Sequence, residues 1–415
     1  MAEIFASKTA EIEEREVINA QISRKLAGEC MVLLENDGAL PIHTKKVALF
    51  GNGARATIKG GTGSGDVNTR NNVNIEQGFQ NAGIEVTTTA WLDRQEQNTS
   101  AAKAAYVQWM KEEAARKQTS ELAVMFDHPY KEPDCEIITI NDIDVSETDT
   151  AVYVIARNSG EGADRFDEEG DYRLYPHERG NIHLLAEVYD KLIVVLNIGG
   201  VMDLSEMRSI AGVNAILLMT QLGNLGGDAL LDVLTGKVNP SGKLPMTIER
   251  SFKDSPAWGY LPQGASLYNE LKNEHLINVY DVNYKEDVLV GYRWYDTKKI
   301  EPLYPFGYGL SYTTFALTKP RLSSNKMNDK QTIKCSVTLT NTGKCEGAEV
   351  VQLYIKENQP SVLRPEKELK RFEKVSLKPG ENRILEFIIT SKDLAFWDDQ
   401  THSWKTNTGQ YTIFL

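Results

Sequence analysis

The run Ala151-Val-Tyr-Val-Ile-Ala156 is followed directly by Arg157-Asn-Ser-Gly-Glu-Gly-Ala-Asp-Arg165, so a wholly apolar stretch gives way to glycine and charge. An uninterrupted apolar run of this length is typical of a strand buried on both faces, as in a parallel sheet covered by helices. Ligands of open α/β sheets bind outside the carboxyl ends of such strands. The segment therefore predicts an α/β fold and a functional site just beyond Ala156.

Apolar runs and helical patterns alternate along the first half of the chain. Further strands are expected at 46–50, 84–88, 192–198 and 213–219, with helical patterns between them, notably at 177–191 and 226–234. An earlier helix is predicted from Val17 to Leu34, with a stop signal at Asn36-Asp-Gly38. This alternation indicates a mostly parallel sheet covered on both faces, in a first domain spanning residues 1–250.

Two segments depart from the alternation. Residues 99–146 combine a helix-like stretch at 101–117 with a loop around 128–133, and we treat them as an insertion whose role the sequence does not reveal. Residues 251–315 are rich in Pro, Gly, Tyr and Trp and predict an irregular linker. Within it, Pro305-Phe-Gly-Tyr-Gly-Leu-Ser-Tyr312 pairs aromatic residues with glycines, and we expect it to pack the linker against both domains.

The last hundred residues follow a different pattern. Period-two alternation recurs at 333–339, 349–355, 382–389 and 410–414. Turn motifs separate the runs, namely Asn341-Thr-Gly343 and Lys378-Pro-Gly380. Several short alternating strands predict a second, all-β sandwich domain at residues 316–415.

The composition excludes some classes of function. A net charge of −12 and a pI near 5.2 disfavour binding to nucleic acid or to an anionic membrane, and are compatible with a neutral polar substrate such as a sugar. No apolar run reaches the ~18 residues of a membrane span, and the first fifteen residues lack an apolar leader. We therefore expect a soluble, cytoplasmic protein with no membrane contact.

Neither the cysteines nor the histidines predict a metal or cofactor site. Cys30, Cys135, Cys335 and Cys345 contain no C-x-x-C pair. Cys335 and Cys345 are close enough to pair across a hairpin, but free buried thiols are the favoured interpretation. The six histidines show no metal-ligand spacing. We expect no metal and no cofactor.

Glu161 is the candidate catalytic residue. It lies between Gly160 and Gly162 on the loop after the 151–156 strand, and flanking glycines let a ligand approach the backbone. A carboxyl group there is suited to general acid/base catalysis. The alternative interpretation is a solvated loop glutamate beside an Asp164–Arg165 ion pair.

A second glycine-rich stretch follows the 46–50 strand. Lys59-Gly-Gly-Thr-Gly-Ser-Gly-Asp66 is not a P-loop, because no Gly-Lys-Ser/Thr follows. Gly51-Asn-Gly-Ala-Arg-Ala56 fits the dinucleotide pattern G-x-G-x-x-A, yet no helical period begins there, so a nucleotide site is disfavoured. A glycine-lined rim with the hydroxyls of Thr62 or Ser64 suits a sugar better. The alternative is a flexible connection. No G-x-S-x-G elbow supports a serine triad.

In their order along the chain, these motifs resemble family 3 glycoside hydrolases. The resemblance rests on motifs spread over most of the sequence: Leu26-Ala-Gly-Glu-Cys-Met-Val-Leu-Leu-Glu-Asn36, Gly60-Gly-Thr-Gly-Ser-Gly65, Ser159-Gly-Glu-Gly-Ala-Asp-Arg165, Pro240-Ser-Gly-Lys-Leu-Pro245, Val290-Gly-Tyr-Arg-Trp-Tyr-Asp296 and the 305–315 stretch. The tail, including Glu368-Leu-Lys-Arg-Phe-Glu-Lys-Val375, resembles the fibronectin type III-like domain of those enzymes.

The resemblance implies a fold and a mechanism. It implies a six-stranded α/β sandwich followed by an all-β fibronectin type III-like sandwich, and a retaining mechanism with an Asp nucleophile on a (β/α)8 barrel and a Glu acid/base on the α/β sandwich. Glu161 matches that acid/base in the β-glucosidase branch, so a β-glucoside is the implied substrate. Ser64 matches a serine that contacts the glycone in similar enzymes, and Thr62 and Asp66 are its neighbours.

The sequence departs from the family's usual order, in which the barrel precedes the sandwich. No succession of eight strand–helix units and no nucleophile motif occurs in it. Some family members have the halves reversed, so we expect this chain to be the first half of such an enzyme. The barrel is then a separate chain or a further segment, and a higher oligomer is conceivable. The open alternatives are a β-xylosidase or arabinosidase, a non-catalytic sugar-binding or scaffolding chain, and, less favoured, a nucleotide-binding enzyme or an N-acetylglucosaminidase.

Overall fold

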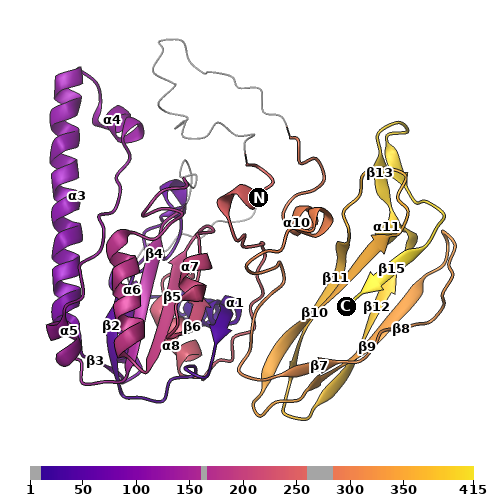
Figure 1. The fold of residues 1–415 in the computed structure, drawn as a ribbon, viewed down its shortest axis with the longest axis horizontal. Helices are drawn as coiled ribbons and strands as arrows, with labels where there is room; N and C mark the ends of the chain where they lie inside the picture. The colour runs from indigo at the N-terminus through magenta and orange to yellow at the C-terminus, as the bar shows by residue number, and fades with distance from the viewer. Residues whose placement is uncertain (1–10, 160–165, 259–283) are drawn as a thin grey trace.

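The fold is taken from a computed structural model, which describes residues 11–159, 166–258 and 284–415. An α/β layer formed by the first part of the chain lies beside an all-β part formed by its end (Figure 1). This is the fold class that the sequence predicts.

A single six-stranded sheet organises the first part. Its strand order is β1-β6-β5-β4-β2-β3. The strands are β1 (Val32–Asn36), β2 (Lys46–Phe50), β3 (Glu85–Val86), β4 (Thr150–Arg157), β5 (Lys191–Ile198) and β6 (Val213–Leu218). Neighbouring strands from β3 through β6 run parallel, and β1 pairs antiparallel with β6. The expected mostly parallel sheet is confirmed.

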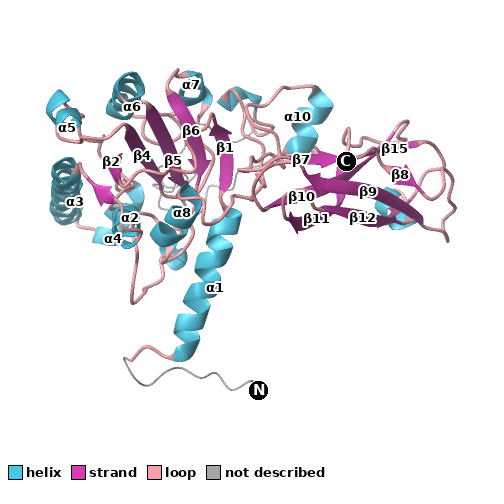
Figure 2. Ribbon diagram, turned by 90° about the horizontal axis from the view of Figure 1, so that it is seen from below, coloured by secondary structure: helices cyan, strands magenta, loops and turns pink. Residues whose placement is uncertain are grey.

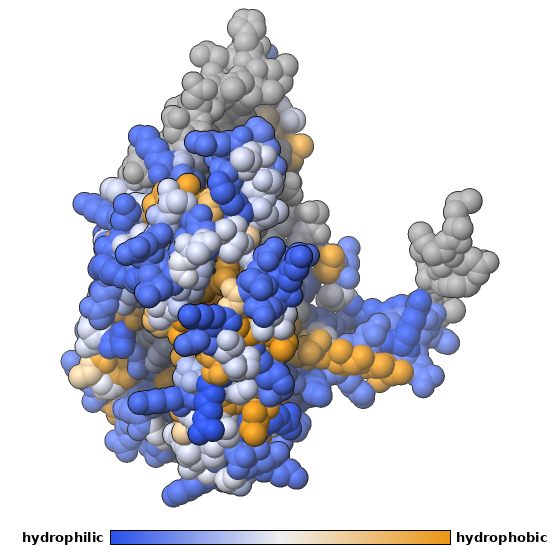
Figure 3. All heavy atoms as spheres, turned by 90° about the vertical axis from the view of Figure 1, so that its right-hand side faces the viewer, coloured by the Kyte–Doolittle hydropathy of each residue, from blue (hydrophilic) through white to orange (hydrophobic). Residues whose placement is uncertain are grey.

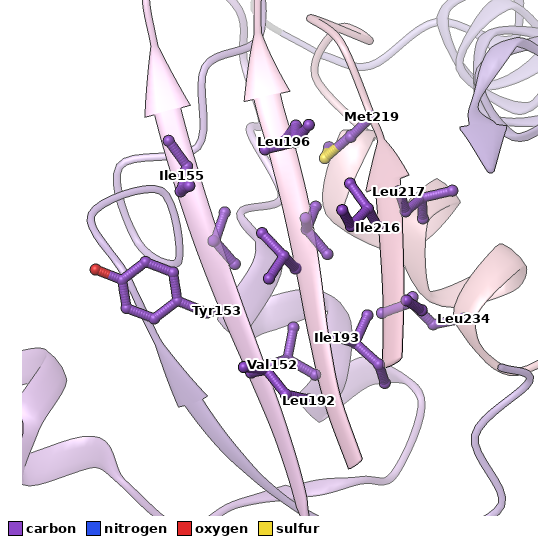
Figure 4. Close-up of a cluster of buried hydrophobic side chains, with 14 of the residues drawn as sticks. Val152, Tyr153, Ile155, Leu192, Ile193, Leu196, Ile216, Leu217, Met219 and Leu234 are labelled. Atoms are coloured by element: carbon purple, nitrogen blue, oxygen red, sulfur yellow. The ribbon is translucent and has the colours of Figure 1, made fainter. Parts of the chain in front are cut away.

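Helices cover both faces of this sheet. They are α1 (Glu14–Cys30), α2 (Ile75–Asn81), α3 (Thr89–Lys117), α4 (Glu121–Asp127), α5 (Ile140–Asp144), α6 (Pro176–Val188), α7 (Ser205–Ser209) and α8 (Gly226–Leu234). In Figure 2, α6 and α7 lie on one face and α2 and α8 on the other. The central strands are therefore buried on both faces, and aliphatic side chains such as Ile193, Leu196 and Ile216 fill the space between the layers (Figure 4).

The expected helix from Val17 to Leu34 is only partly right. Helix α1 ends at Cys30, and residues 32–36 form strand β1, whose Leu33 lies opposite Leu217 of β6. Leu33 and Leu34 are both fully buried, and the pairing with β6 shifts register at Leu34. Adjacent leucines fit a helical period as well as a two-faced strand, and only the pairing with β6 decides between them.

The insertion contains the longest helix of the described residues. Helix α3 spans 29 residues, so it begins well before the helix-like stretch expected at 101–117. It runs alongside the sheet and extends past the carboxyl edge, where α4 folds back against it (Figure 1). Residues 128–139 then return toward the sheet.

The end of the chain forms a β-sandwich. One sheet contains β11 (Glu368–Leu377), β10 (Gly347–Glu357) and β15 (Tyr411–Phe414), and the other contains β12 (Asn382–Ile389), β9 (Ile333–Asn341), β7 (Phe315–Leu317) and β8 (Arg321–Leu322). Side chains from β9, β10, β11 and β12 form one shared core. The short α11 (Ser391–Leu394) and the hairpin of β13 (Phe396–Asp398) and β14 (Ser403–Lys405) complete it. Both predicted turns join strands of opposite sheets.

The described part of the linker contacts both parts of the molecule. It includes helix α10 (Tyr292–Lys298). Leu310 N donates to Leu33 O of β1 at 2.8 Å, and Gln352 of β10 donates through Nε2 to Gly307 O at 3.2 Å. Tyr292 stacks on Phe306, with ring centroids 4.8 Å apart. The expectation that 305–312 packs against both domains is confirmed.

Candidate active site

The loops that follow β2, β4, β5 and β6 meet at the carboxyl edge of the sheet. We call them the carboxyl rim, made up of residues 51–74, 158–159, 199–204 and 219–225. The parallel direction of these strands brings all four loops to the same edge, although they are far apart in the sequence. Both glycine-rich motifs predicted from the sequence belong to this rim or border it.

The loop after β2 is fitted tightly against the end of β4. Gly51 has φ +96°, and a Cβ there would lie 2.1 Å from Val154 O. The Asn52 side chain donates to Ala156 O at 3.2 Å and accepts from Ala156 N at 2.8 Å, as a neighbouring strand would. Residues 51–56 form turns rather than the start of a helix. The G-x-G-x-x-A pattern thus has a packing explanation.

A buried asparagine ties two loops of the rim together. Asn197 is fully buried near the end of β5; its Nδ2 donates to Ile58 O at 3.0 Å and Thr220 O at 2.6 Å, and its Oδ1 accepts from Ile58 N at 2.6 Å. Gly223 N adds a bond to Lys59 O at 2.8 Å. Sequence reasoning missed Asn197, although one amide in the apolar run 192–198 is a visible signal, since buried amides need partners.

The Gly-rich loop carries three of the predicted site residues. Gly63–Gly65 form a short 3-10 turn; Ser64 lies within it, and its side chain is outside the described part of the structure. Thr62 Oγ1 is buried without a hydrogen-bond partner, which is uncommon for such a hydroxyl. Asp66 is exposed and accepts from Lys59 Nζ at 2.6 Å. That hydrogen bond lowers the pKa of Asp66, and Lys103 of α3 lowers it further.

Glu161 lies outside the described residues, but both ends of its loop are described. Arg157, the last residue of β4, and Glu178, in the first turn of α6, form an ion pair and are 5% and 1% exposed. Glu178 also accepts from Tyr175 N at 2.9 Å, and the Arg157 guanidinium lies 5.4 Å from the centre of the Tyr175 ring. This buried charge pair joins the end of β4 to the start of α6, the two elements between which Glu161 lies in the sequence.

Polar side chains meet beside this loop. Gln221 donates through Nε2 to Asn158 Oδ1 at 3.1 Å. A Cβ on Gly199 would lie 2.6 Å from both Gln221 Nε2 and Ser159 Oγ, so a larger residue would displace them. The ends of β4, β5 and β6 therefore converge next to the stem of the 160–165 loop.

The insertion borders the same rim, which the sequence did not indicate. Lys103 is close enough to influence the pKa of Asp66. Tyr175 donates through its hydroxyl to Glu132 O at 2.6 Å, and Lys131 pairs with Glu168. The insertion also contains an aromatic cluster made up of Tyr106, Trp109, His128 and Tyr130. Its neighbouring ring centroids are 5.3 to 5.9 Å apart. Residues 89–139 thus form a wall along one side of the rim.

A separate hollow of about 630 Å³ lies away from the rim, between α1, α2, α8 and residues 42–45 before β2. Both of its carboxylates are held by a cation, because Arg24 pairs with Asp228 and Asp232 and Lys237 pairs with Asp232. This pairing disfavours either aspartate as a catalytic acid.

All four cysteines are free; Cys135 and Cys335 are buried as expected, whereas Cys30 and Cys345 are exposed. Among the described residues, no group of three or more His, Cys, Asp or Glu side chains is arranged to hold a metal. No helix in the described ranges is both long and apolar enough to cross a membrane.

Comparison with known proteins agrees with the observed fold. The model of the glycosyl hydrolase family 3 C-terminal domain matches residues 31–312, and that of the fibronectin type III-like domain matches 349–415. The chain is 41% identical over 257 residues to beta-glucosidase BoGH3A of Bacteroides ovatus, covering 61% of this chain and 32% of the relative. It is 32% identical over 439 residues to beta-glucosidase A of Butyrivibrio fibrisolvens, covering 95% of this chain and 49% of the relative.

Solved structures give the same result. Beta-glucosidase 3B of Thermotoga neapolitana, in complex with glycerol, superposes with a TM-score of 0.77 at 33% identity, covering 98% of this chain and 52% of that one. Its complex with glucose gives the same TM-score. The chain spans between a third and a half of the length of these curated relatives and about half of this solved chain.

Proposed function

This chain belongs to glycosyl hydrolase family 3, whose C-terminal domain model matches more than half of it, and from that premise we propose that it supplies the acid/base half of a retaining β-glucosidase. In this proposal Glu161 is the general acid/base. The Asp nucleophile belongs to a (β/α)8 barrel that completes the site. The substrate class is terminal β-D-glucosides, since the relatives named above are called beta-glucosidases.

The observation that carries the proposal is the buried Arg157–Glu178 pair, which joins the end of β4 to the start of α6, the two elements that precede and follow residues 160–165 in the sequence. The glycine-rich loop that carries Thr62, Ser64 and Asp66 belongs to the same carboxyl rim as the end of β4. A catalytic carboxyl group needs a supporting structure that holds its loop at a fixed distance from the substrate. A buried ion pair contributes little net stability compared with apolar side chains of the same size, so a positioning role explains its presence here better than stability does.

The proposed chemistry needs two carboxyl groups about 5–5.5 Å apart on opposite sides of the glycosidic bond. Glu161 protonates the leaving oxygen while the barrel carboxylate attacks the anomeric carbon. Glu161 then takes a proton from the water that releases the sugar. To start protonated near neutral pH, it needs a pKa raised by burial or by the neighbouring carboxylate, and a docked barrel supplies both. Thr62, Ser64 and Asp66 are the proposed hydrogen-bonding partners of the sugar.

The first experiment compares two mixtures on an aryl β-glucoside. One contains this chain alone, and the other adds the part of the Butyrivibrio fibrisolvens enzyme that lies outside the match. We expect turnover only in the second mixture, because the nucleophile is supplied by the barrel. Turnover by this chain alone would overturn the shared-site proposal.

The second experiment tests Glu161 in the active mixture. Glu161→Ala should lower kcat by at least about a hundredfold, and azide or an activated leaving group should restore part of it, since both bypass proton transfer. Glu169→Gln, an exposed change just beyond the same loop, is the matched control and should leave turnover unchanged. Equal rates for Glu161→Ala and the parent would exclude the acid/base role.

The third experiment concerns the glycone. Aryl β-glucoside, β-xyloside and α-arabinofuranoside are compared at equal concentration in the active mixture. We expect the glucoside to have the highest kcat/KM. A preference for either pentoside would move the proposal to the β-xylosidase or arabinosidase activity of the same family. Sugar binding without turnover of any of them would favour a non-catalytic role.

A further inference from the structure

Helix α1 projects from the α/β layer. Figure 2 shows its N-terminal end extending away from the other described elements of that layer. Its C-terminal half is fastened to α8, since Arg24 pairs with Asp232 at 2.6 Å and Asp228 at 3.2 Å, and Ala27 and Gly28 are buried. The helix is therefore held firmly along one side while the rest of its surface faces outward.

The outward surface carries an apolar stripe, which we define as Ile18, Ile22 and Leu26. These side chains are 47%, 52% and 54% exposed and recur at every fourth position, so they lie on one side of the helix. A row of hydrophobic side chains is visible along the projecting helix in Figure 3. The exposed Cys30 is the next residue at the same spacing. A contiguous apolar row on a projecting element is typical of an interaction surface.

Charged residues at the two ends of α1 connect the helix to two other parts of the molecule. Glu16, at the start of α1, accepts from Arg70 of the carboxyl rim at 2.8 Å, and Glu29, near its end, pairs with Lys374 of β11 at 3.1 Å. An exposed apolar side chain lies close in sequence to each contact. Val67 is 60% exposed on the rim, and Phe372 is 68% exposed two positions before Lys374 on the same face of β11.

We infer that the apolar stripe of α1 is a docking surface for the (β/α)8 barrel that completes the site, an inference that rests on the proposed function. A barrel that brings its carboxylate to within about 5–5.5 Å of Glu161 must cover the carboxyl rim. Helix α1 is joined to that rim through Arg70, which contacts Glu16 two residues before Ile18, so a body seated on the rim lies next to the N-terminal end of the stripe.

A second copy of this chain is a less suitable occupant. Three half-exposed aliphatic side chains bury far less than the ~800 Å² per partner that a stable dimer needs. The same stripe is sufficient as the extension of an interface that already includes the rim. The relatives also extend well beyond the matched region, since the match covers 49% of the Butyrivibrio enzyme and 52% of the Thermotoga chain.

The test measures binding separately from turnover. The probe is the unmatched part of the Butyrivibrio fibrisolvens enzyme, titrated against the full chain and against Ile22→Asp and Leu26→Asp variants. The matched control is Ile384→Asp, which alters an isoleucine of similar exposure, 66%, on β12 of the sandwich. Circular dichroism melting checks that each variant is folded, as expected for changes at exposed positions. Cys30, in a Cys345→Ser background, reports docking through its reaction rate with a maleimide.

We expect the two stripe variants to raise Kd at least about tenfold, because an Asp would be desolvated in the interface, while Ile384→Asp binds like the parent. The probe should also slow maleimide labelling of Cys30. If the parent and the stripe variants bind and turn over equally, the inference is wrong and the proposed function stands. If the parent neither binds nor is activated, the proposed function fails and the inference with it. Self-association that Ile22→Asp abolishes would identify a second copy as the occupant and overturn the inference.

Discussion

Strands β4 and β9 are similar in length but differ in their surroundings. All eight residues of β4 are buried, whereas along β9 buried side chains alternate with partly or fully exposed ones. β4 lies between β2 and β5 in a sheet covered by helices on both faces, and β9 lies in a sandwich with one face outward. This difference shows which parts of each region a ligand can reach. The α/β sheet has no free face for a ligand, so its chemistry is confined to the loops at its edge.

The largest expected effect comes from placing the same charge in each strand. Val154→Asp puts a carboxylate in a fully buried position of β4 and should cost at least about 4 kcal/mol of unfolding free energy, enough to prevent folding. Thr338→Asp, on the outward face of β9, should cost less than about 1 kcal/mol. Urea unfolding followed by circular dichroism measures both. Similar losses of unfolding free energy for the two variants would contradict the difference in burial between β4 and β9.

An intermediate loss of stability is expected when a buried ion pair is broken in each of the two regions. Glu178→Gln leaves Arg157 buried without a charged partner and should cost about 3–5 kcal/mol. Glu357→Gln is the matched change in the sandwich, where Arg364 keeps a second partner in Glu368, so the cost should be smaller.

The two variants also differ in their expected effect on function. Glu178→Gln should lower turnover in the active mixture at temperatures where the chain remains folded, because the stems of the Glu161 loop lose their anchor. Glu357→Gln should leave turnover unchanged. Equal turnover for both would show that the anchor has no positioning role.

The smallest expected loss of stability is the loosening of helix α1 at low pH, because this helix is buried on one side only. Burial would raise the pKa of Asp232, but hydrogen bonds from Arg24 and Lys237 outweigh it and leave that pKa below its ordinary value. A lowered folded-state pKa means that the contribution is present above the unfolded value of about 3.9 and is lost as the pH falls through the folded value. Loosening of α1 below about pH 4, worth about 1 kcal/mol, should appear as faster amide exchange in residues 14–30. Asp232→Asn should loosen α1 at neutral pH and remove this dependence.

The parts of the fold that local pattern determines were predictable from the sequence. The bounds of β2 and α8 agree with the expected ranges. β4 is one residue longer than expected at both ends, and β5 is one residue longer at its start. These bounds were predictable because a long apolar run has few alternative structures. Strand β1 was not predictable, since Leu33 and Leu34 fit either period and the pairing with β6 comes from a residue about 185 positions away.

The candidate site was predictable only in part. Glycine loops after apolar strands identify the carboxyl rim. The family resemblance selects Glu161, which follows the rim residues 158–159 in the sequence and stays a prediction. The side chains that hold the rim together were not predictable, because the amides of Asn52 and Asn197 bond to backbone groups of distant loops. The position of the insertion beside the rim was not predictable either, since its nearness to Asp66 through Lys103 depends on how far α3 extends past the sheet.

The hydrogen bond from Leu310 to Leu33 determines where the chain can be truncated. β1 is the outermost strand of its sheet, and its outer carbonyl groups are taken by Gly242 N at Met31 O and by Leu310 N at Leu33 O. Tyr308 adds a bond from its hydroxyl to Leu34 O at 3.1 Å. A polypeptide that stopped before residue 304 would keep every strand of the sheet yet uncover part of this edge, and uncovered edges pair with other chains. Such a fragment should be prone to aggregation. Residues 304–312 therefore protect the edge of β1 from pairing with strands of other chains.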